Sequence, residues 1–377
     1  MLSIDIILFS IFLGINLILG LLAGRRVKTL RDYSIGGKDF STATITSTIV
    51  ATWIGGGFMF YGLQNIYSTG LQFIIPLVCD SFTLLFTGLF LAVRMGEFLK
   101  NLSIAEAMGD LYGRSVRIIT AICGILVSVG AIAIQFKVTA KILNILFPLG
   151  EIYSIILAAS IVVIYSAFGG IRAVTFTDVI QFFAFGTIIP LLTLVIWHGI
   201  KDHSTIIHFL QTSPKFSYKV LISSPQKLSY TLGLMLFYFI PGFVPAVFQR
   251  VSIANNVEQV KKTFIYAFGL TLIICFFTIS IAVLLSGVNP DLDPSNVFRY
   301  IIEFSSYPGF KGIILIGVMA MIMSTADSHI NSTAVLLTND IVKPLGKHFK
   351  HDILFARVFS FVLGALALVL ALYKTEF

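Results

Sequence analysis

Hydroxyl side chains recur at helical spacing within one apolar segment of the chain. Ser324, Ser328 and Ser332 are each four residues apart, and Thr325 follows the first of them. On a helix, residues four apart share a face, so these hydroxyls form one polar stripe. Lipid cannot satisfy polar groups, and leaving them unpaired in a bilayer is costly. The stripe must therefore face protein, water or a bound ion. Packing hydroxyls that bond back to their own helix are the alternative to an ion site.

Two other apolar segments contain helix-breaking residues. Three adjacent glycines at 55–57 lie inside the segment 42–66, and each weakens a helix by ~1 kcal/mol relative to Ala. Pro241 and Pro245 interrupt the segment 228–248, because proline lacks a backbone donor and clashes with the preceding turn. Broken helices at membrane depth are tolerated where they line a cavity, and their freed carbonyls can hold cations. Close packing of the glycines and an ordinary proline kink are the alternatives.

Composition identifies the chain as an integral membrane protein. Of its 377 residues, 57% are hydrophobic and only 12% are charged, whereas a soluble domain carries about 25% charged residues. About ten apolar runs reach the length of ~20 residues that a membrane span needs. The runs lie near 4–24, 42–66, 71–93, 117–146, 152–168, 178–198, 228–248, 262–285, 309–336 and 352–373. The predicted fold is therefore all-α and polytopic, with about ten transmembrane helices in a single domain, 1–377.

Basic residues predict the orientation of these spans. We expect 1–24 to be a retained span, because no basic residue precedes its apolar run and Arg25 and Arg26 follow it. If the loop 25–40 is cytoplasmic, so are the predicted loops at 94–116, 169–177, 249–261 and 337–351. The loops on that side carry roughly three times as many Lys and Arg residues as the opposite loops. The chain is thus expected in the cell (inner) membrane with its N-terminus outside. The net charge of +8 fits this topology signal and does not indicate nucleic acid.

Five segments resemble the sodium/solute symporter family, and they occur in the expected order. They are residues 31–38, 51–57, 166–181, Gln249-Arg250, and the hydroxyl stripe with Asn339-Asp340. The resemblance implies a leucine-transporter-like core, with 1–24 as an accessory helix, a first repeat at 42–198 and a second repeat at 228–377. Family members usually continue for several more helices, so the second repeat is expected to be incomplete and to lack the last core helix.

The resemblance also implies a sodium site between the first and eighth core helices. Ala51, Ile54 and Met321 would contribute backbone carbonyls, and Ser324 and Thr325 would contribute hydroxyls. The chemistry of these groups agrees with that assignment, because a hard cation prefers oxygen ligands. Neutral oxygens also suit a weakly held monovalent ion that must exchange.

Other residues are expected on the ion pathway and in the solute cavity. Asp178 matches a family position where the carboxylate would help sodium to leave inward. The solute would bind between the two broken helices, beside Gly55, Gly56, Phe58, Phe243 and Val244. One further carboxylate, Asp80, lies inside an apolar run. We expect it to pair with a basic side chain, and a functional role is the alternative.

The sequence predicts a sodium-coupled secondary symporter that takes up a small organic solute. A membrane sensor module of a signalling protein and an inactive, truncated remnant of a symporter are the alternatives. Phosphate-binding, zinc-protease, CxxC and nucleophile-elbow motifs are absent, so we expect no enzyme activity. The expected partners are the solute and the lipid bilayer, with no nucleic acid. Sodium is the coupling ion, and no cofactor is expected. The identity of the solute and the oligomeric state do not follow from the sequence.

Overall fold

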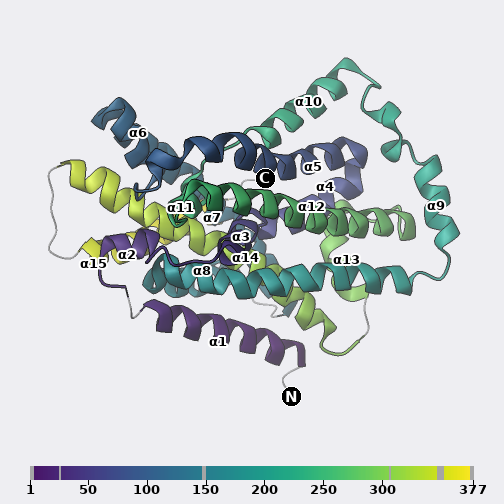
Figure 1. Ribbon diagram of the computed structural model, residues 1–377. Coiled ribbons are helices and arrows are strands. Elements are labelled where there is room, and N and C mark those ends of the chain that lie inside the picture. The colour runs from purple at the N-terminus through teal and green to yellow at the C-terminus, as the bar shows by residue number, and fades with distance from the viewer. Residues whose placement is uncertain (1–3, 25–26, 147–149, 305–306, 346–351, 374–377) are drawn as a thin grey trace.

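Helices form all of the regular structure in the described part of the chain (Figure 1). The computed structural model describes residues 4–24, 27–146, 150–304, 307–345 and 352–373. Its longer helices are α1 (Ile4–Gly24), α3 (Thr42–Trp53), α4 (Gly56–Thr69), α5 (Leu71–Phe86), α7 (Arg114–Leu146), α8 (Glu151–Gly199), α10 (Pro225–Phe239), α12 (Val257–Val288), α14 (Phe310–Val335) and α15 (Asp352–Leu372). Shorter helices are α2 (Leu30–Ile35), α6 (Ile104–Tyr112), α9 (His203–Thr212), α11 (Pro245–Ser252) and α13 (Val297–Phe304). Two π-helical turns, η1 (Thr87–Leu91) and η7 (Leu336–Val342), extend α5 and α14.

Most of the predicted spans correspond to long apolar helices. Among the described residues, seven helices are long and apolar enough to cross a membrane, or eight if α3 and α4 form one bent span. Two predicted spans take other forms. The run 152–168 is the shorter first part of α8, and the run 228–248 is divided between α10 and α11, with non-helical backbone at 240–244. The prediction of an all-α polytopic membrane protein is confirmed.

The loop expected at 169–177 is much shorter in the structure, because the chain turns at Gly170 and the second helical part of α8 resumes directly after it. The helix turns sharply at Gly170, where the backbone has φ +62° and ψ 179°. That conformation is accessible essentially to glycine alone. A Cβ atom at this position would also lie 3.0 Å from the Tyr33 ring. Glycine therefore allows a tight turn between the two helical parts of α8.

One helix occupies the centre of the bundle. The candidate span Phe310–Val342, formed by α14 and η7, is 89% buried, whereas the other candidate spans are 17–44% buried. It packs against α1, α3, α7, α8, α11 and α15. The outer helices instead expose large apolar side chains along their length, such as Leu126 at 67% and Phe183 at 63%, as a surface in contact with lipid does. The hydroxyl stripe lies on α14 and therefore faces protein on every side.

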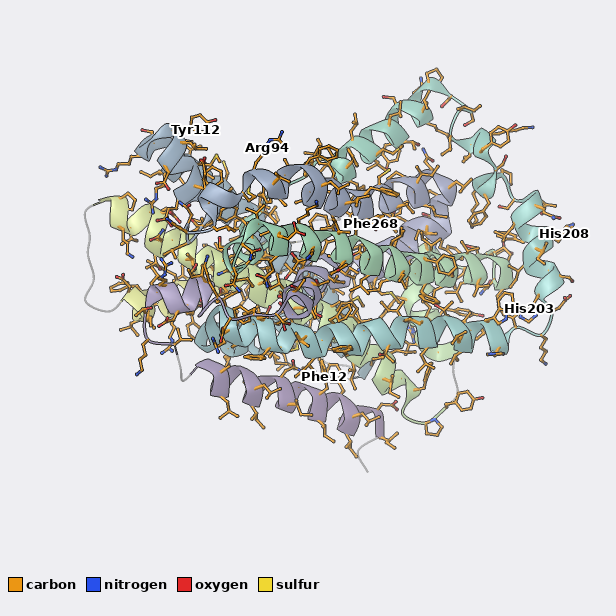
Figure 2. All side chains as sticks on the ribbon, in the orientation of Figure 1. Phe12, Arg94, Tyr112, His203, His208 and Phe268 are labelled. Atoms are coloured by element: carbon orange, nitrogen blue, oxygen red, sulfur yellow. The ribbon has the colours of Figure 1, made fainter. Side chains whose placement is uncertain are left out.

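Four of the five short helices lie toward the two ends of the bundle, whereas α11 packs against α3 and α14. Figure 1 shows α2 and α6 at one end and α9 and α13 at the other. In Figure 2, His203 and His208 lie at the α9 end, and Phe12 and Phe268 lie along the length of the bundle. At the α2 end, Arg172 donates a hydrogen bond of 2.5 Å to Asp39 and thereby holds the pKa of that carboxyl below its usual value.

Candidate functional site

The predicted break in the second apolar segment separates α3 from α4. Helix α3 ends at Trp53, because Ile54 adopts a non-helical conformation with φ −90° and ψ 87°. Gly55 is extended and begins α4, whose axis is bent by 52° from that of α3. The last carbonyls of a helix have no partner within it. The Ile54 N–H still reaches the Val50 carbonyl at 2.9 Å, and the carbonyls that follow Val50 must find other donors.

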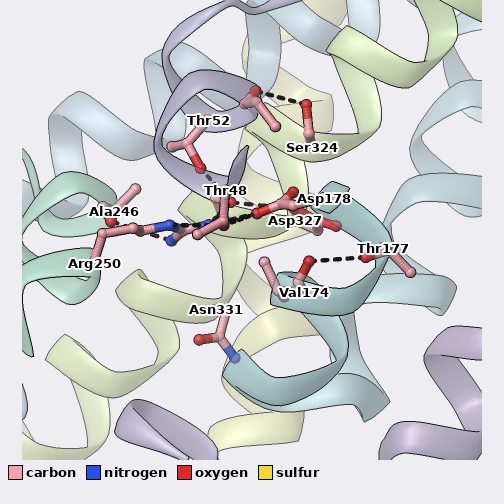
Figure 3. Close-up of polar contacts among 12 residues, drawn as sticks. Thr48, Thr52, Val174, Thr177, Asp178, Ala246, Arg250, Ser324, Asp327 and Asn331 are labelled. Carbon is pink, nitrogen blue, oxygen red and sulfur yellow. Dashed lines mark hydrogen bonds and ion pairs between the residues drawn. The ribbon is translucent and has the colours of Figure 1, made fainter. Parts of the chain in front are cut away.

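Hydroxyls of α14 supply those donors. The Ser324 hydroxyl lies 2.7 Å from the Ala51 carbonyl and 3.0 Å from the Met321 carbonyl, and can donate to either (Figure 3). The Thr325 hydroxyl donates to the Thr52 carbonyl at 3.3 Å. Ser324 is fully buried and Thr325 is 6% exposed. The structure thus brings four of the five predicted sodium ligands to one place, between the end of α3 and the middle of α14.

These neutral oxygens fit a monovalent cation. Three carbonyls and two hydroxyls lie together in a buried setting, and each hydroxyl retains lone pairs that can turn toward an ion. Within the described residues, no group of three or more His, Cys, Asp or Glu side chains could hold a metal ion. The oxygen set at the helix break therefore suits sodium better than a transition metal.

The fifth predicted ligand, Ile54, directly follows the last residue of α3. It is fully buried at the C-terminal cap of α3, and its role as a carbonyl ligand remains a prediction. The Thr325 hydroxyl is directed instead at the carbonyl of Thr52, a residue that the sequence did not single out. Helix-end geometry could have identified it, because every carbonyl in the last turn before a break lacks an internal partner.

The glycines after the break bring α4 close to its neighbours. A Cβ on Gly55 would lie 2.9 Å from the Thr325 hydroxyl, and a Cβ on Gly56 would lie 2.2 Å from Cγ1 of Ile322. The Gly56 N–H donates to the Gln135 side chain of α7 at 3.1 Å. These contacts support the close-packing interpretation of the glycines. A role for Gly55 and Gly56 beside the solute remains a prediction.

The second predicted break provides one wall of a narrow crevice. Phe243 lies in the non-helical segment 240–244 and lines about 180 Å³ of empty space that has no room for a water-sized sphere. The lining residues are Trp53, Thr87, Pro241, Gly242, Phe243, Val247 and Phe264. Phe58 on α4 and Val244 at the start of α11 are partly buried and lie outside this lining. Of the predicted solute residues, the structure places only Phe243 in the crevice.

Asp178 is part of a buried ion pair. The Arg250 guanidinium of α11 donates to the Asp178 carboxylate of α8 at 2.9 Å, and both side chains are completely buried (Figure 3). Arg250 also donates to the Thr48 hydroxyl of α3 and to the Ser328 hydroxyl of α14. Thr48 in turn donates to Asp178. One guanidinium therefore joins four helices at a single level of the bundle.

This ion pair is connected to the oxygen set at the helix break. Ser328, which accepts from Arg250, lies 3.1 Å from the Thr52 hydroxyl, and the carbonyl of Thr52 accepts from Thr325. The sequence identified Gln249-Arg250 only as a motif without a role. The sequence did contain an indication that Arg250 has such a role, because an intramembrane carboxylate such as Asp178 requires a partner.

Asp80 has a partner of a different kind from the one expected. Its carboxylate accepts a hydrogen bond of 2.6 Å from the indole N–H of Trp53, the last residue of α3. No Lys, Arg or His in the described ranges forms an ion pair with it. The expectation of a basic partner is therefore wrong. Trp53 lies 27 residues away in the sequence, and only the fold brings it to Asp80.

The chain forms a membrane-embedded helical bundle, and its central helix contacts the freed carbonyls of a broken helix. This is the architecture of a secondary transporter. The chain belongs to the sodium:solute symporter family, whose model matches residues 33–376. Family membership, the membrane setting and the transporter class agree with the predictions from sequence. Because the family is one of transporters, the expectation that the chain is not an enzyme also holds.

Curated relatives share about a quarter of their residues with this chain. A sodium/glucose cotransporter of Vibrio parahaemolyticus is 25% identical over 382 residues, which cover 90% of this chain and 69% of that protein. A high-affinity choline transporter 1 of Drosophila melanogaster is 25% identical over 402 residues, which cover 98% of this chain and 62% of that protein. The high-affinity proline transporter PutP of Bacillus subtilis is 23% identical, with 96% of this chain and 79% of that protein covered. The chain thus spans about three fifths to four fifths of these relatives.

A solved structure has the same fold. The substrate-bound, outward-open state of a Na⁺-coupled sialic acid symporter superposes with a TM-score of 0.88 at 21% identity, covering 98% of this chain and 82% of that chain. The leucine-transporter-like fold implied by the sequence is therefore confirmed.

Proposed function

We propose that this protein couples the movement of sodium to the movement of a small organic solute across the cell (inner) membrane. The observation that carries the proposal is the convergence of Ala51, Met321, Ser324 and Thr325 at the break between α3 and α4. Ala51 lies about 270 positions before Met321, Ser324 and Thr325 in the sequence. Only a fold that brings Ala51 to the other three residues gives one set of oxygen ligands.

Sodium would bind by replacing hydrogen bonds within this set. The Ser324 and Thr325 hydroxyls now donate to carbonyls of α3. With an ion between the helices, each hydroxyl would turn a lone pair inward, and the carbonyls of Ala51, Ile54 and Met321 would complete the ligands. Bound sodium would therefore hold the end of α3 against α14, and its departure would release that contact.

Ion release would run past Asp178. The carboxylate is linked to the proposed site through Arg250, Ser328 and Thr52, and its Oδ1 atom, which accepts no hydrogen bond in the described structure, would offer an oxygen to the departing ion. The basic loops at the α2 end favour an orientation with that end in the cytoplasm and the N-terminus outside. We also propose that 42–198 and 228–377 belong to two repeats, which move against each other during transport.

The solute would bind next to the break, near Gly55, Gly56, Phe58, Phe243 and Val244. Similar proteins are named for different solutes, including glucose, choline, proline and sialic acid. These names do not select one solute for this chain. Transport is favoured over a sensor role because both groups of cation ligands are present and in contact.

Thr325→Ala is expected to raise the sodium concentration for half-maximal binding about tenfold, equivalent to about 1.4 kcal/mol, because one oxygen ligand is lost. The measurement is the sodium-dependent rise in melting temperature of the purified protein, with potassium replacing sodium at constant ionic strength. Thr325→Ser keeps the hydroxyl and should retain most of the affinity.

Thr333→Ala is the matched control for this experiment. Thr333 is fully buried on the same helix, but its hydroxyl donates to the His329 carbonyl of its own helix at 2.6 Å. Its removal should leave the sodium dependence unchanged. Equal sodium curves for the wild type and Thr325→Ala would contradict the proposed site.

A further inference from the structure

An unpaired carboxylate lies inside one of the candidate spans. Asp80 is in α5, within the span Leu71–Arg94, and is partly buried. Its only hydrogen-bond donor among the described residues is the Trp53 indole, at 2.6 Å. A single neutral donor compensates poorly for a negative charge at membrane depth. Such a group is costly to keep unless it binds something.

Several helices meet near this carboxylate. Helix α5 packs against α4, α10 and α12. The Thr83 hydroxyl, one turn along α5, donates to the Tyr238 carbonyl at 2.8 Å. Asp80 therefore lies where α3, α5, α10 and α12 meet, with no basic group from any of them in ion-pair contact.

Trp53 connects this carboxylate to the crevice beneath the second break. The indole donates to Asp80, and Trp53 also lines the crevice together with Phe243 and Phe264. No charged residue is among the described residues of that lining. A positively charged nitrogen is attracted both by a carboxylate and by the faces of aromatic rings. A solute carboxylate would instead be repelled, and a sugar would leave the Asp80 charge unbalanced.

We propose that the solute carries a positively charged nitrogen, which pairs with Asp80 and contacts the rings of Trp53 and Phe243. This inference rests on the proposed transport function and specifies its substrate class. Trp53 is the last residue of α3 and directly precedes Ile54 and the break. Sodium, by fixing the end of α3 against α14, would also fix the indole that orients the Asp80 carboxylate. Binding of the charged nitrogen should therefore depend on sodium.

The test uses the purified full chain and solutes that differ in charge. Choline, ethanolamine and tetramethylammonium carry a charged nitrogen and no carboxylate, whereas 3,3-dimethyl-1-butanol, an uncharged isostere of choline, and glucose have no charged nitrogen. Each is titrated against the melting temperature in saturating sodium, with potassium as the comparison. At least one of the first three should raise the melting temperature in sodium, and the two uncharged solutes should not.

Asp80→Asn should raise the solute concentration for half of the maximal rise in melting temperature by at least about thirtyfold, as expected for the loss of a buried charge partner. Asp80→Glu keeps the charge and should restore part of it.

The sodium response without solute separates this inference from the transport proposal. Asp80→Asn should keep the sodium-dependent rise in melting temperature, which shows that the variant is folded and that the ion site is intact. Equal affinities of the wild type and Asp80→Asn for a charged solute would overturn the inference. So would a sodium-dependent rise in melting temperature with glucose alone, or no such rise with any of the three charged solutes. Loss of the sodium response in the wild type itself would overturn the proposed function.

Discussion

Arg250→Met is expected to destabilise the protein by about 3–5 kcal/mol, because it leaves the Asp178 carboxylate buried without its partner. Both side chains are completely buried, and they are 2.9 Å apart. The guanidinium also donates to Thr48 and Ser328, so the substitution removes hydrogen bonds to α3 and α14 as well. The free energy of unfolding in detergent, or the melting temperature, measures the effect.

Removing both charges should cost much less than removing one. In Arg250→Met combined with Asp178→Asn, no unpaired charge remains, and the two substitutions should compensate each other in a double-mutant cycle. Arg299→Met is the matched control, because Arg299 and Glu303 are also 2.9 Å apart but are 70% and 60% exposed. Exposed pairs contribute little, so this variant should have nearly wild-type stability. Equal losses for Arg250→Met and Arg299→Met would contradict a structural role for the buried pair.

Signals local to the chain were sufficient to predict the class of fold. Apolar runs of about 20 residues are strong evidence for spans, because a bilayer leaves backbone groups no other partner. The glycines at 55–57 located the break between α3 and α4 correctly. The loop expected at 169–177 was too long, because a helix resumes directly after the turn at Gly170. Tyr33 lies close to Gly170, a contact that the local sequence does not contain.

Partners across the fold could not be predicted in the same way. Asp80 and Trp53 are 27 residues apart, and Asp178 and Arg250 are 72 residues apart. The two residues of each pair lie on different helices, so only tertiary packing determines which groups meet. The proposed ion site was different, because the resemblance to a family had already joined its two groups of predicted ligands. Even there, the resemblance did not include Thr52, whose carbonyl accepts the Thr325 hydroxyl.

Gly56→Ala is expected to destabilise the protein by about 3 kcal/mol, at the upper end for over-packing. The added methyl group would lie 2.2 Å from Cγ1 of Ile322, a fully buried and branched side chain of α14. Relief requires either a shift of Ile322 or separation of α4 from α14. Separation would also draw α4 away from the proposed sodium ligands, so the sodium affinity should fall together with the stability.

Ile322→Ala tests whether this contact is the cause. Alone, it should destabilise by about 2–5 kcal/mol through the cavity it creates. Combined with Gly56→Ala, it removes the clash, so the double variant should lose less than the sum of the single changes, with a coupling of about 0.5–3 kcal/mol. Gly62→Ala is the control on the same helix, because a Cβ there would meet nothing within 4 Å. It should be neutral or stabilising, since Ala favours a helix by ~1 kcal/mol over Gly. Strict additivity of Gly56→Ala and Ile322→Ala would rule out the direct contact as the reason for glycine. Recovery of sodium affinity in the double variant would show that the approach of α4 to α14 sets the geometry of the ion site.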